Sequence, residues 1–211
     1  MTRPEVPRLH LIGPLNGVVA PGSYAAIAAQ AAEGGVDAIH VRLPGMAGGE
    51  IMRLARDVAD RLGSDMNTML FVNDRVDVAM LVEAMGAHLG ERSLSIAQAR
   101  SLLGANALIG RSVHDLHGAI QAQDQGADFV LAGHVFDTES KAGQPGKGVD
   151  WIARLASAVS IPVIAIGGIR AERVRAVMQA GAWGVAVGRE ILAAPSPKAS
   201  ATVIRARMQQ K

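Results

Sequence analysis

The stretch PVIAIGGIRAERVRAVMQAGAWGVAVG, residues 162–188, decides the fold class. It opens with an apolar run of strand length at 162–168, continues with a helix-period segment at Glu172–Ala180, and closes with a second apolar run at 184–188. Buried parallel strands read as continuous apolar runs, and a helix must connect them. The stretch therefore predicts one βαβ unit of a helix-covered parallel sheet.

The same alternation extends along the chain. Apolar runs of strand length occupy residues 8–13, 38–42, 68–73, 87–90, 107–112, 128–133, 162–168 and 184–188. Helix-period segments lie between them, at Tyr24–Glu33, Glu50–Leu62, Val76–Met85, Ile96–Leu103, Leu116–Gln125, Val149–Val159 and Glu172–Ala180. Eight such units, without a glycine-rich turn after the first strand, favour a (β/α)₈ barrel over an open doubly wound sheet. We expect a single TIM-barrel domain over residues 1–211.

Glycine recurs where the expected helices pass into strands, in EGGVDAIH, AMGAHLG, DQGADFV and QAGAWGV. Glycine at such junctions is expected to end the helix in the left-handed conformation. Only APSPKAS, residues 194–200, reads as a loose segment, ahead of a short basic terminal helix.

Composition limits the classes of function. Of the 211 residues, 49% are hydrophobic and 3% aromatic, so aliphatic side chains must build the core. The net charge is +2, and no basic run with interleaved aromatics indicates a nucleic-acid partner. Cysteine is absent, which excludes disulfides and thiolate chemistry. No apolar run approaches the length of a membrane span, so we expect a cytoplasmic protein without a membrane partner.

Strong polar residues gather where the strands should end, and in a TIM barrel that face carries the active site. His10 and His88 lie within strands and are expected to pack inside, whereas His117 should be exposed. The residues expected at the strand ends are His40, Arg42, Asn73, Asp74, Glu91, Ser93, Ser112 and His114, followed by the loop GHVFDTESKAGQPGKG at 133–148.

Two glycine turns follow the last two strands. Each joins a strand to a helix, so bare backbone N–H groups can approach an anion at a helix N-terminus. The loops after strands 7 and 8 form the common phosphate site of TIM barrels. A simple tight turn is the alternative interpretation. We expect a phosphate at Gly167, Gly168, Ile169, Val187 and Gly188.

Several motifs, taken together and in order, resemble one known family. They are VNDRVDVAM, GAHLGERSLS, IGRSVHD, GADFVLAGHVFDTESKAGQPGKGVDW, IPVIAIGGI and GAWGVAVG. From about Leu9 to Leu192 the chain resembles the thiamine phosphate synthase superfamily, and most closely its TenI branch, which includes thiazole tautomerase. The resemblance implies a (β/α)₈ barrel that binds a small-molecule thiazole phosphate on the loops after strands 7 and 8. It leaves a homo-oligomer open.

The choice of branch depends on charge. Superfamily members that make thiamine phosphate hold pyrophosphate and Mg²⁺ with a Gln-x-Arg-x-Lys pattern, an Asn-Asp pair and a further aspartate. Here Arg42 and the Asn-Asp pair remain, but His40 and Pro44 replace the glutamine and the lysine, and Ser93 replaces the aspartate. A hard divalent cation depends on oxygen ligands such as that carboxylate. We therefore expect a cofactor-independent isomerase, with Mg²⁺ needed only if the synthase alternative holds.

Residue His134 carries the isomerase prediction. The loop has GHVF-x-T, as in TenI-like proteins, where synthases usually have Gly-Pro. The tautomerase aromatises a 2-carboxy dihydrothiazole ethyl phosphate by moving a proton from ring carbon C2 to the exocyclic carbon. Imidazole suits proton transfer near neutral pH, so His134 is the expected catalytic residue, and His134→Gln should slow the reaction by about 10²–10⁴-fold. A structural hydrogen bond from His134 to a loop carbonyl is the alternative.

The other expected contacts position the substrate. Arg42 would pair with the carboxylate, and Asp74 would orient Arg42 or cap the next helix. Besides tautomerase, the sequence leaves open a thiamine phosphate synthase, which joins hydroxymethylpyrimidine pyrophosphate to thiazole phosphate, and a non-catalytic TenI-like regulator. The full set of expected substrate-binding residues is His40, Arg42, Asn73, Asp74, Ser112, His114, Thr138, Ser140 and Lys141, with no resident metal.

Overall fold

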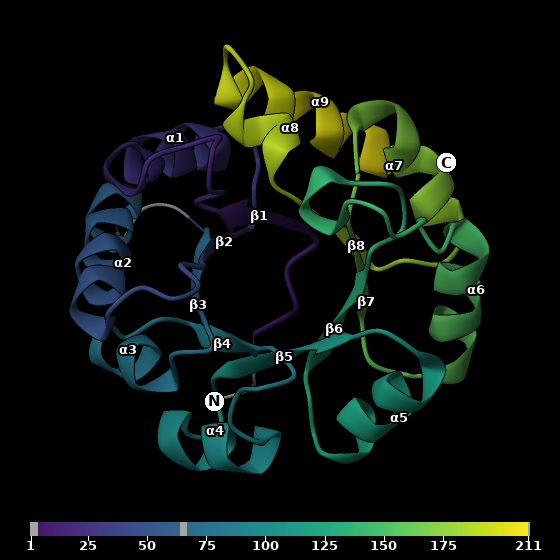
Figure 1. Ribbon diagram of the computed structural model, residues 1–211, viewed down its shortest axis with the longest axis horizontal. Helices are drawn as coiled ribbons and strands as arrows, with labels where there is room; N and C mark the ends of the chain where they lie inside the picture. Colours follow the sequence, from purple (N-terminus) through teal and green to yellow (C-terminus); the bar gives the residue numbers. More distant parts are fainter. Residues whose placement is uncertain (1–3, 64–66, 211) are drawn as a thin grey trace.

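Eight parallel strands close into a barrel in chain order, in a computed structural model that describes residues 4–63 and 67–210 (Figure 1). The barrel closes where β1 pairs with β8 and Leu9 faces Val185. This confirms the predicted (β/α)₈ barrel, while the single-domain prediction for 1–211 includes residues 1–3, 64–66 and 211, which lie outside the described part. The strands are β1 (Leu9–Gly13), β2 (Ala38–Val41), β3 (Met69–Asn73), β4 (Gly86–Leu89), β5 (Leu108–Val113), β6 (Phe129–Gly133), β7 (Val163–Ile166) and β8 (Gly184–Val187).

Helices surround the barrel, as Figure 1 shows. Aliphatic side chains fill the layer between strands and helices. In the described part of the chain, no helix combines the length and the apolar character needed to cross a membrane. The helices are α1 (Pro21–Glu33), α2 (Gly48–Leu62), α3 (Val76–Leu81), α4 (Ile96–Leu103), α5 (Leu116–Asp124), α6 (Val149–Ala158), α7 (Ala171–Gln179), α8 (Arg189–Leu192) and α9 (Pro197–Gln209), with a 3₁₀ turn, η1, at Glu139–Lys141.

Three expectations about local structure need correction. Helix α3 ends at Leu81 rather than Met85, because Glu83 adopts a left-handed φ of 52° and turns the chain into β4. Helix α9 includes most of the segment predicted to be loose, because Ser196 caps it and Pro197 suits its first turn. Gly86 does not end a helix: it starts β4, where a Cβ would collide with the Leu108 carbonyl.

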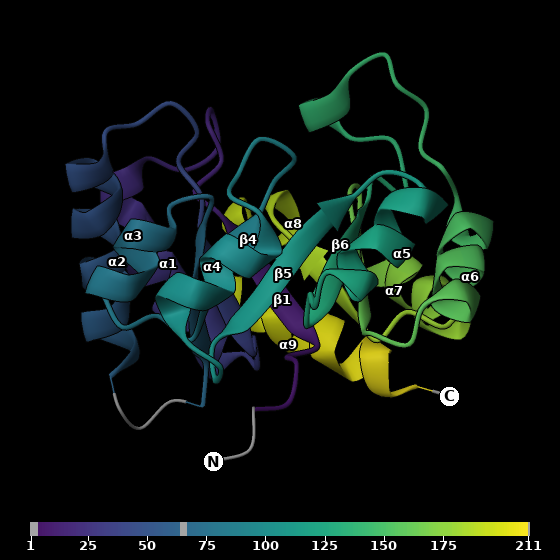
Figure 2. The ribbon, with the colours of Figure 1, turned by 90° about the horizontal axis from the view of Figure 1, so that it is seen from below.

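The segment before β1 closes the end of the barrel opposite the long β6–α6 loop (Figure 2). The Trp183 indole N–H donates to the Val6 carbonyl at 2.9 Å, and His10 Nε2 lies 2.9 Å from the Pro7 carbonyl. Above this floor the barrel interior holds a layer of rings from His10, His40, Phe71, His88 and Phe129. The mouth therefore opens at the other end, over an interior that is partly polar.

Candidate active site

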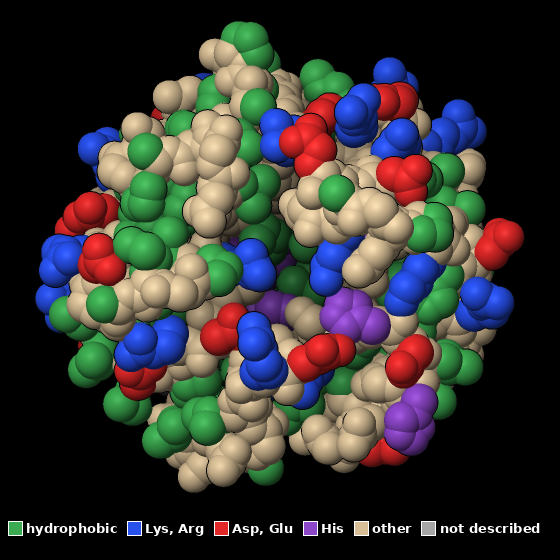
Figure 3. Space-filling model, in the orientation of Figure 1, with side chains coloured by type: hydrophobic (Ala, Val, Ile, Leu, Met, Phe, Trp, Pro, Cys, Tyr) green, Lys and Arg blue, Asp and Glu red, His purple; other side chains and the backbone are tan. Residues whose placement is uncertain are grey.

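A cavity of about 2140 Å³ occupies the mouth of the barrel, among the loops that follow the strands. Figure 3 looks into it and shows Lys and Arg side chains around a central hollow. Every predicted site residue except His40 lines this cavity. The residues brought together are Arg42, Asn73, Asp74, Ser112, His114, His134, Thr138, Ser140, Lys141, Gly167, Gly168, Ile169, Val187 and Gly188.

The turn after β7 presents backbone N–H groups to the cavity. Gly167 and Gly168 have φ values of 101° and 63°, which side chains rarely adopt, and a Cβ on Gly167 would collide with His134. Within the described residues, the N–H groups of Gly168 and Ile169 have no protein acceptor. An anion in the cavity could therefore accept from both of them.

The turn after β8 lies beside the first one and is held by charged side chains. Gly188 leads directly into α8, and Leu15 from the β1–α1 loop packs over it. A carboxylate oxygen of Glu190 accepts from the N–H of Ala171, at the start of α7, at 3.2 Å. Arg189 pairs with Glu139 of η1 at 2.6 Å, which joins the β6–α6 loop to this turn.

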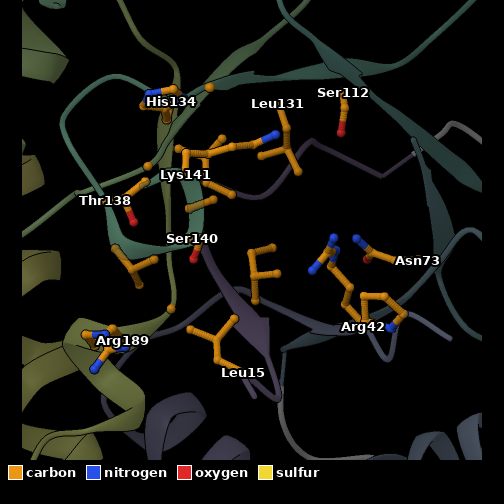
Figure 4. A pocket seen from close by; sticks show the side chains of 18 of the residues that line it. Leu15, Arg42, Asn73, Ser112, Leu131, His134, Thr138, Ser140, Lys141 and Arg189 are labelled. Atoms are coloured by element: carbon orange, nitrogen blue, oxygen red, sulfur yellow. The ribbon is translucent and has the colours of Figure 1, made fainter. Parts of the chain in front are cut away.

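The 3₁₀ turn η1 brings a cation into the cavity. The N–H of Lys141 donates to the Thr138 carbonyl at 3.0 Å, which fixes the turn. Figure 4 shows Lys141 and Arg42 reaching into the pocket from opposite sides, with Leu131 and Leu15 nearby. The cavity thus combines cationic side chains with apolar ones in its lining.

The aspartate after β3 has a strained backbone and a fixed carboxylate. Asp74 has a φ of 64°, in the left-handed region. Its Oδ1 accepts from the N–H of Gly90 at 2.8 Å and from the hydroxyl of Ser93. The predicted helix-capping role is wrong, because Arg75 occupies the N-cap position of α3. The carboxylate is instead held at the mouth.

The structure gives His134 the contact that the sequence left as an alternative. The side chain follows β6, is 9% exposed, and places Nε2 3.1 Å from the Gln144 carbonyl of its own loop. The His134 carbonyl also accepts from the N–H of Lys147 at 3.1 Å. These contacts close the β6–α6 loop upon itself, with the imidazole as part of its framework.

Ser112, on β5, and His114, just beyond the end of β5, each contact neighbouring elements. The Ser112 hydroxyl bonds His88 Nε2 at 2.8 Å, and the pKa of His88 falls to about 3 because it is buried. His114 lies on the rim, with Nε2 3.6 Å from a carboxylate oxygen of Glu91. The Lys147 ammonium donates to the His114 carbonyl. The Glu91 carboxylate is therefore directed toward His114.

Residue His40 lies beneath the cavity, where its side chain is fully buried. Its ring bonds His10 at 2.9 Å and Asn73 at 3.1 Å and stacks on Phe71. Burial lowers the pKa of His40 well below its ordinary value and that of His10 to about 4, so both rings are neutral. The expected place of His40 in the ring pocket therefore needs correction, because its side chain packs into the barrel interior.

Among the residues of the mouth that sequence reasoning missed are Leu15 and Arg189. Arg189 follows Gly188 directly, so its position just after the last strand could have predicted a place at the mouth. Leu15 gave no signal, because an isolated leucine in a loop is ordinary. Its position depends on the packing of the β1–α1 loop over Gly188.

Comparisons with known proteins agree on one family. The family described as thiamine monophosphate synthase matches residues 16–191. A thiamine-phosphate synthase of Salinibacter ruber is 40% identical over 205 residues, which cover 96% of this chain and 88% of that one. Its counterpart in Haloarcula marismortui is 38% identical and covers 87% and 89%. The structure of a thiamine phosphate pyrophosphorylase from Pyrococcus furiosus has a TM-score of 0.85 and 29% identity, covering 96% and 95%.

These relatives overturn the prediction of a TenI-type thiazole tautomerase. They bear the names of synthases, they span most of the chain, and they favour the synthase alternative over the isomerase. The error came from giving His40, Pro44 and Ser93 more weight than the similarity of the rest of the chain. Similarity along nearly the full length shows that the chain belongs to the thiamine monophosphate synthase family.

Proposed function

We propose that the protein is a transferase that joins hydroxymethylpyrimidine pyrophosphate to a thiazole phosphate and releases pyrophosphate. The observation that carries the proposal is the similarity to synthases over 96% of the chain. The shape of the mouth supports it, because two groups of anion-binding residues face each other across the barrel. The turns after β7 and β8 form one group, and Arg42 with Asn73, at the ends of β2 and β3, forms part of the other.

Each group suits one substrate. The free N–H groups of Gly168 and Ile169 fit the phosphate of the thiazole. Arg42 and Lys141 supply positive charge for the pyrophosphate, which gains negative charge as its bond to the methylene carbon attached to the pyrimidine ring breaks. Leu15 and Leu131 offer apolar contacts to the rings between the two anions. The protein would thus act mainly by positioning two substrates and stabilising the leaving group.

The family resemblance implies Mg²⁺, and the mouth supplies one fixed carboxylate for it. Mg²⁺ is usually held by one or two carboxylates together with substrate phosphates. The described residues contain no group of three acidic or histidine side chains that could hold a metal. Asp74 supplies one carboxylate, and Ser93 and the Gly90 N–H keep it in place. The ion, when bound by Asp74 and the pyrophosphate, would neutralise charge on the leaving group.

An assay with both substrates tests this function. With Mg²⁺ present, the protein should form thiamine phosphate and pyrophosphate in equal amounts, measured by mass spectrometry and a pyrophosphate-release assay. Asp74→Asn should raise the Mg²⁺ concentration needed for half-maximal rate, whereas Asp57→Asn, on the exposed face of α2, should not. If the wild-type protein forms no thiamine phosphate with both substrates and Mg²⁺ in excess, the proposal is wrong.

A further inference from the structure

Three buried polar side chains connect the floor of the barrel to its mouth. His10 Nε2 lies 2.9 Å from the Pro7 carbonyl, and His10 Nδ1 lies 2.9 Å from His40 Nε2. His40 Nδ1 in turn lies 3.1 Å from the side-chain amide of Asn73. Of the three side chains, only Asn73 lines the cavity. A continuous hydrogen-bond path therefore runs from below β1 to the active-site face.

The direction of every bond in this path follows from its lower end. The Pro7 carbonyl can only accept, so His10 must carry its proton on Nε2. A neutral imidazole has one N–H, which leaves His10 Nδ1 as an acceptor for His40 Nε2–H. His40 Nδ1 is then bare as well. The group that faces it must be a donor.

That donor can only be the NH₂ end of the Asn73 amide. The amide atom at 3.1 Å is placed as Oδ1, but the two ends of an amide have the same shape and the hydrogen-bond network decides between them. A charged His40 could donate to an oxygen there. Full burial and the nearby His10 and His88 disfavour that charge and hold the pKa of His40 well below its usual value.

We propose that the Pro7–His10–His40 chain fixes Asn73 with its NH₂ toward the barrel interior and its carbonyl oxygen toward the mouth. Figure 4 shows the Asn73 amide and the Arg42 guanidinium pointing toward one another. A carbonyl in that place could accept a hydrogen bond from the guanidinium, whereas an NH₂ would face a second donor. His10 and His40 are thus positioning residues that hold Arg42 ready for an anionic substrate group through Asn73.

The tautomers can be measured without any activity. In ¹⁵N-resolved NMR of the whole protein at neutral pH, both His10 and His40 should be neutral with the proton on Nε2. The Asn73 NH₂ should show coupling to His40 Nδ1 across the hydrogen bond. An Nδ1–H tautomer or a charged ring at His40 would overturn the proposal, whether or not the protein is a synthase.

A pair of variants tests the consequence for the site and rests on the proposed function. His10→Gln keeps a donor for Pro7 and an acceptor for His40, whereas His10→Phe removes both and leaves His40 and Asn73 free to reverse. His10→Phe should raise KM for the pyrimidine pyrophosphate about tenfold, the worth of one hydrogen bond to a charged group. His10→Gln should restore it. His117→Phe, at an exposed position of α5, is the control for the substitution itself.

The NMR experiment and the kinetic comparison of variants can each contradict the inference independently. A synthase assay without product leaves the NMR arm to decide the inference alone. Equal KM values in His10→Phe and the wild type, with only a lower melting temperature, would reduce His10 to a packing role and contradict the positioning proposal. Retention of the Nε2–H tautomer of His40 in His10→Phe would do the same, because the ring would then not depend on its partner.

Discussion

The mouth and the interior of the barrel use polar side chains in opposite ways. At the mouth, Arg42, Asp74 and Lys141 are exposed and face a cavity. In the interior, His10 and His40 are fully buried, neutral and bonded to other protein groups. Polarity at the mouth is available to a ligand, whereas the ring nitrogens of His10 and His40 are occupied by protein partners. The comparison teaches that a histidine near an active site can act by orienting another group rather than by exchanging a proton.

The largest expected effect is the loss of folding stability in acid, which comes from the buried histidines of the interior. His10 and His88 have folded-state pKa values of about 4 and 3, and that of His40 is also lowered. In the unfolded chain these rings take up protons below pH 6.5, whereas in the folded barrel they stay neutral. Stability is therefore fully present above pH 6.5 and falls as the pH drops toward 4.

At pH 5 this linkage costs about 2 kcal/mol each for His10 and His88, or about 4 kcal/mol together, and His40 acts in the same direction. Urea unfolding at pH 7 and pH 5 measures the difference in unfolding free energy. His10→Phe should flatten the dependence, because one buried titrating ring is gone. An unfolding free energy that stays constant from pH 7 to pH 5 would contradict the neutral interior.

The glycine turn of the mouth offers the next largest effect. Gly167→Ala combines a left-handed backbone, worth about 1–2 kcal/mol, with overpacking against His134, worth about 1–3 kcal/mol. Gly126→Ala is the matched control, since φ is 86° there and no atom lies within 4 Å of the added methyl. Unfolding experiments should therefore show a larger loss for Gly167→Ala, together with weaker thiazole phosphate binding. Equal losses would mean that the turn does not depend on close packing against His134.

A substitution beside Asp74 should have a smaller effect, on the Mg²⁺ concentration that the reaction needs. Ser93→Asp adds a second carboxylate beside Asp74, which repels it without Mg²⁺ and adds a ligand with it. The Mg²⁺ concentration for half-maximal synthase activity should fall about tenfold, equivalent to about 1.4 kcal/mol. Ser93→Asn, which has the same size without the charge, should not lower it. A shift in the opposite direction for Ser93→Asp would show that no cation binds at Asp74.

Substitution of His134 should have the smallest effect, a modest decrease in the rate of the synthase reaction. His134 contacts the Gln144 carbonyl, and glutamine can still donate to it. His134→Gln should therefore slow the synthase reaction by less than about tenfold, the worth of one neutral hydrogen bond. Steady-state kinetics measure this. A loss of three orders of magnitude would mean that His134 takes part in proton transfer after all.

The sequence predicted the strands well because each is a short apolar run between turn residues. Barrel geometry converts a strand end into a place at the mouth, and the strand-end residues other than His40 do line the cavity, while their roles in binding and catalysis stay predictions. The sequence failed at His40, whose side chain points into the barrel and bonds His10 from a neighbouring strand. Strand spacing gives the end of a strand but not the partners that a ring finds across the barrel. It also failed on the choice of branch, where a few substitutions outweighed the overall similarity.

The segment that carries Val6 and Pro7 has a practical consequence for protein engineering. Its carbonyls accept from Trp183 and face His10, at the end of the molecule opposite the long β6–α6 loop (Figure 2). An expression tag, a fusion partner or a shortened start that displaces these two residues would remove the lower anchor of the path to Asn73. Such a protein could keep every residue of its active site and still lose affinity, so biosensor designs and fusions should begin upstream of Val6.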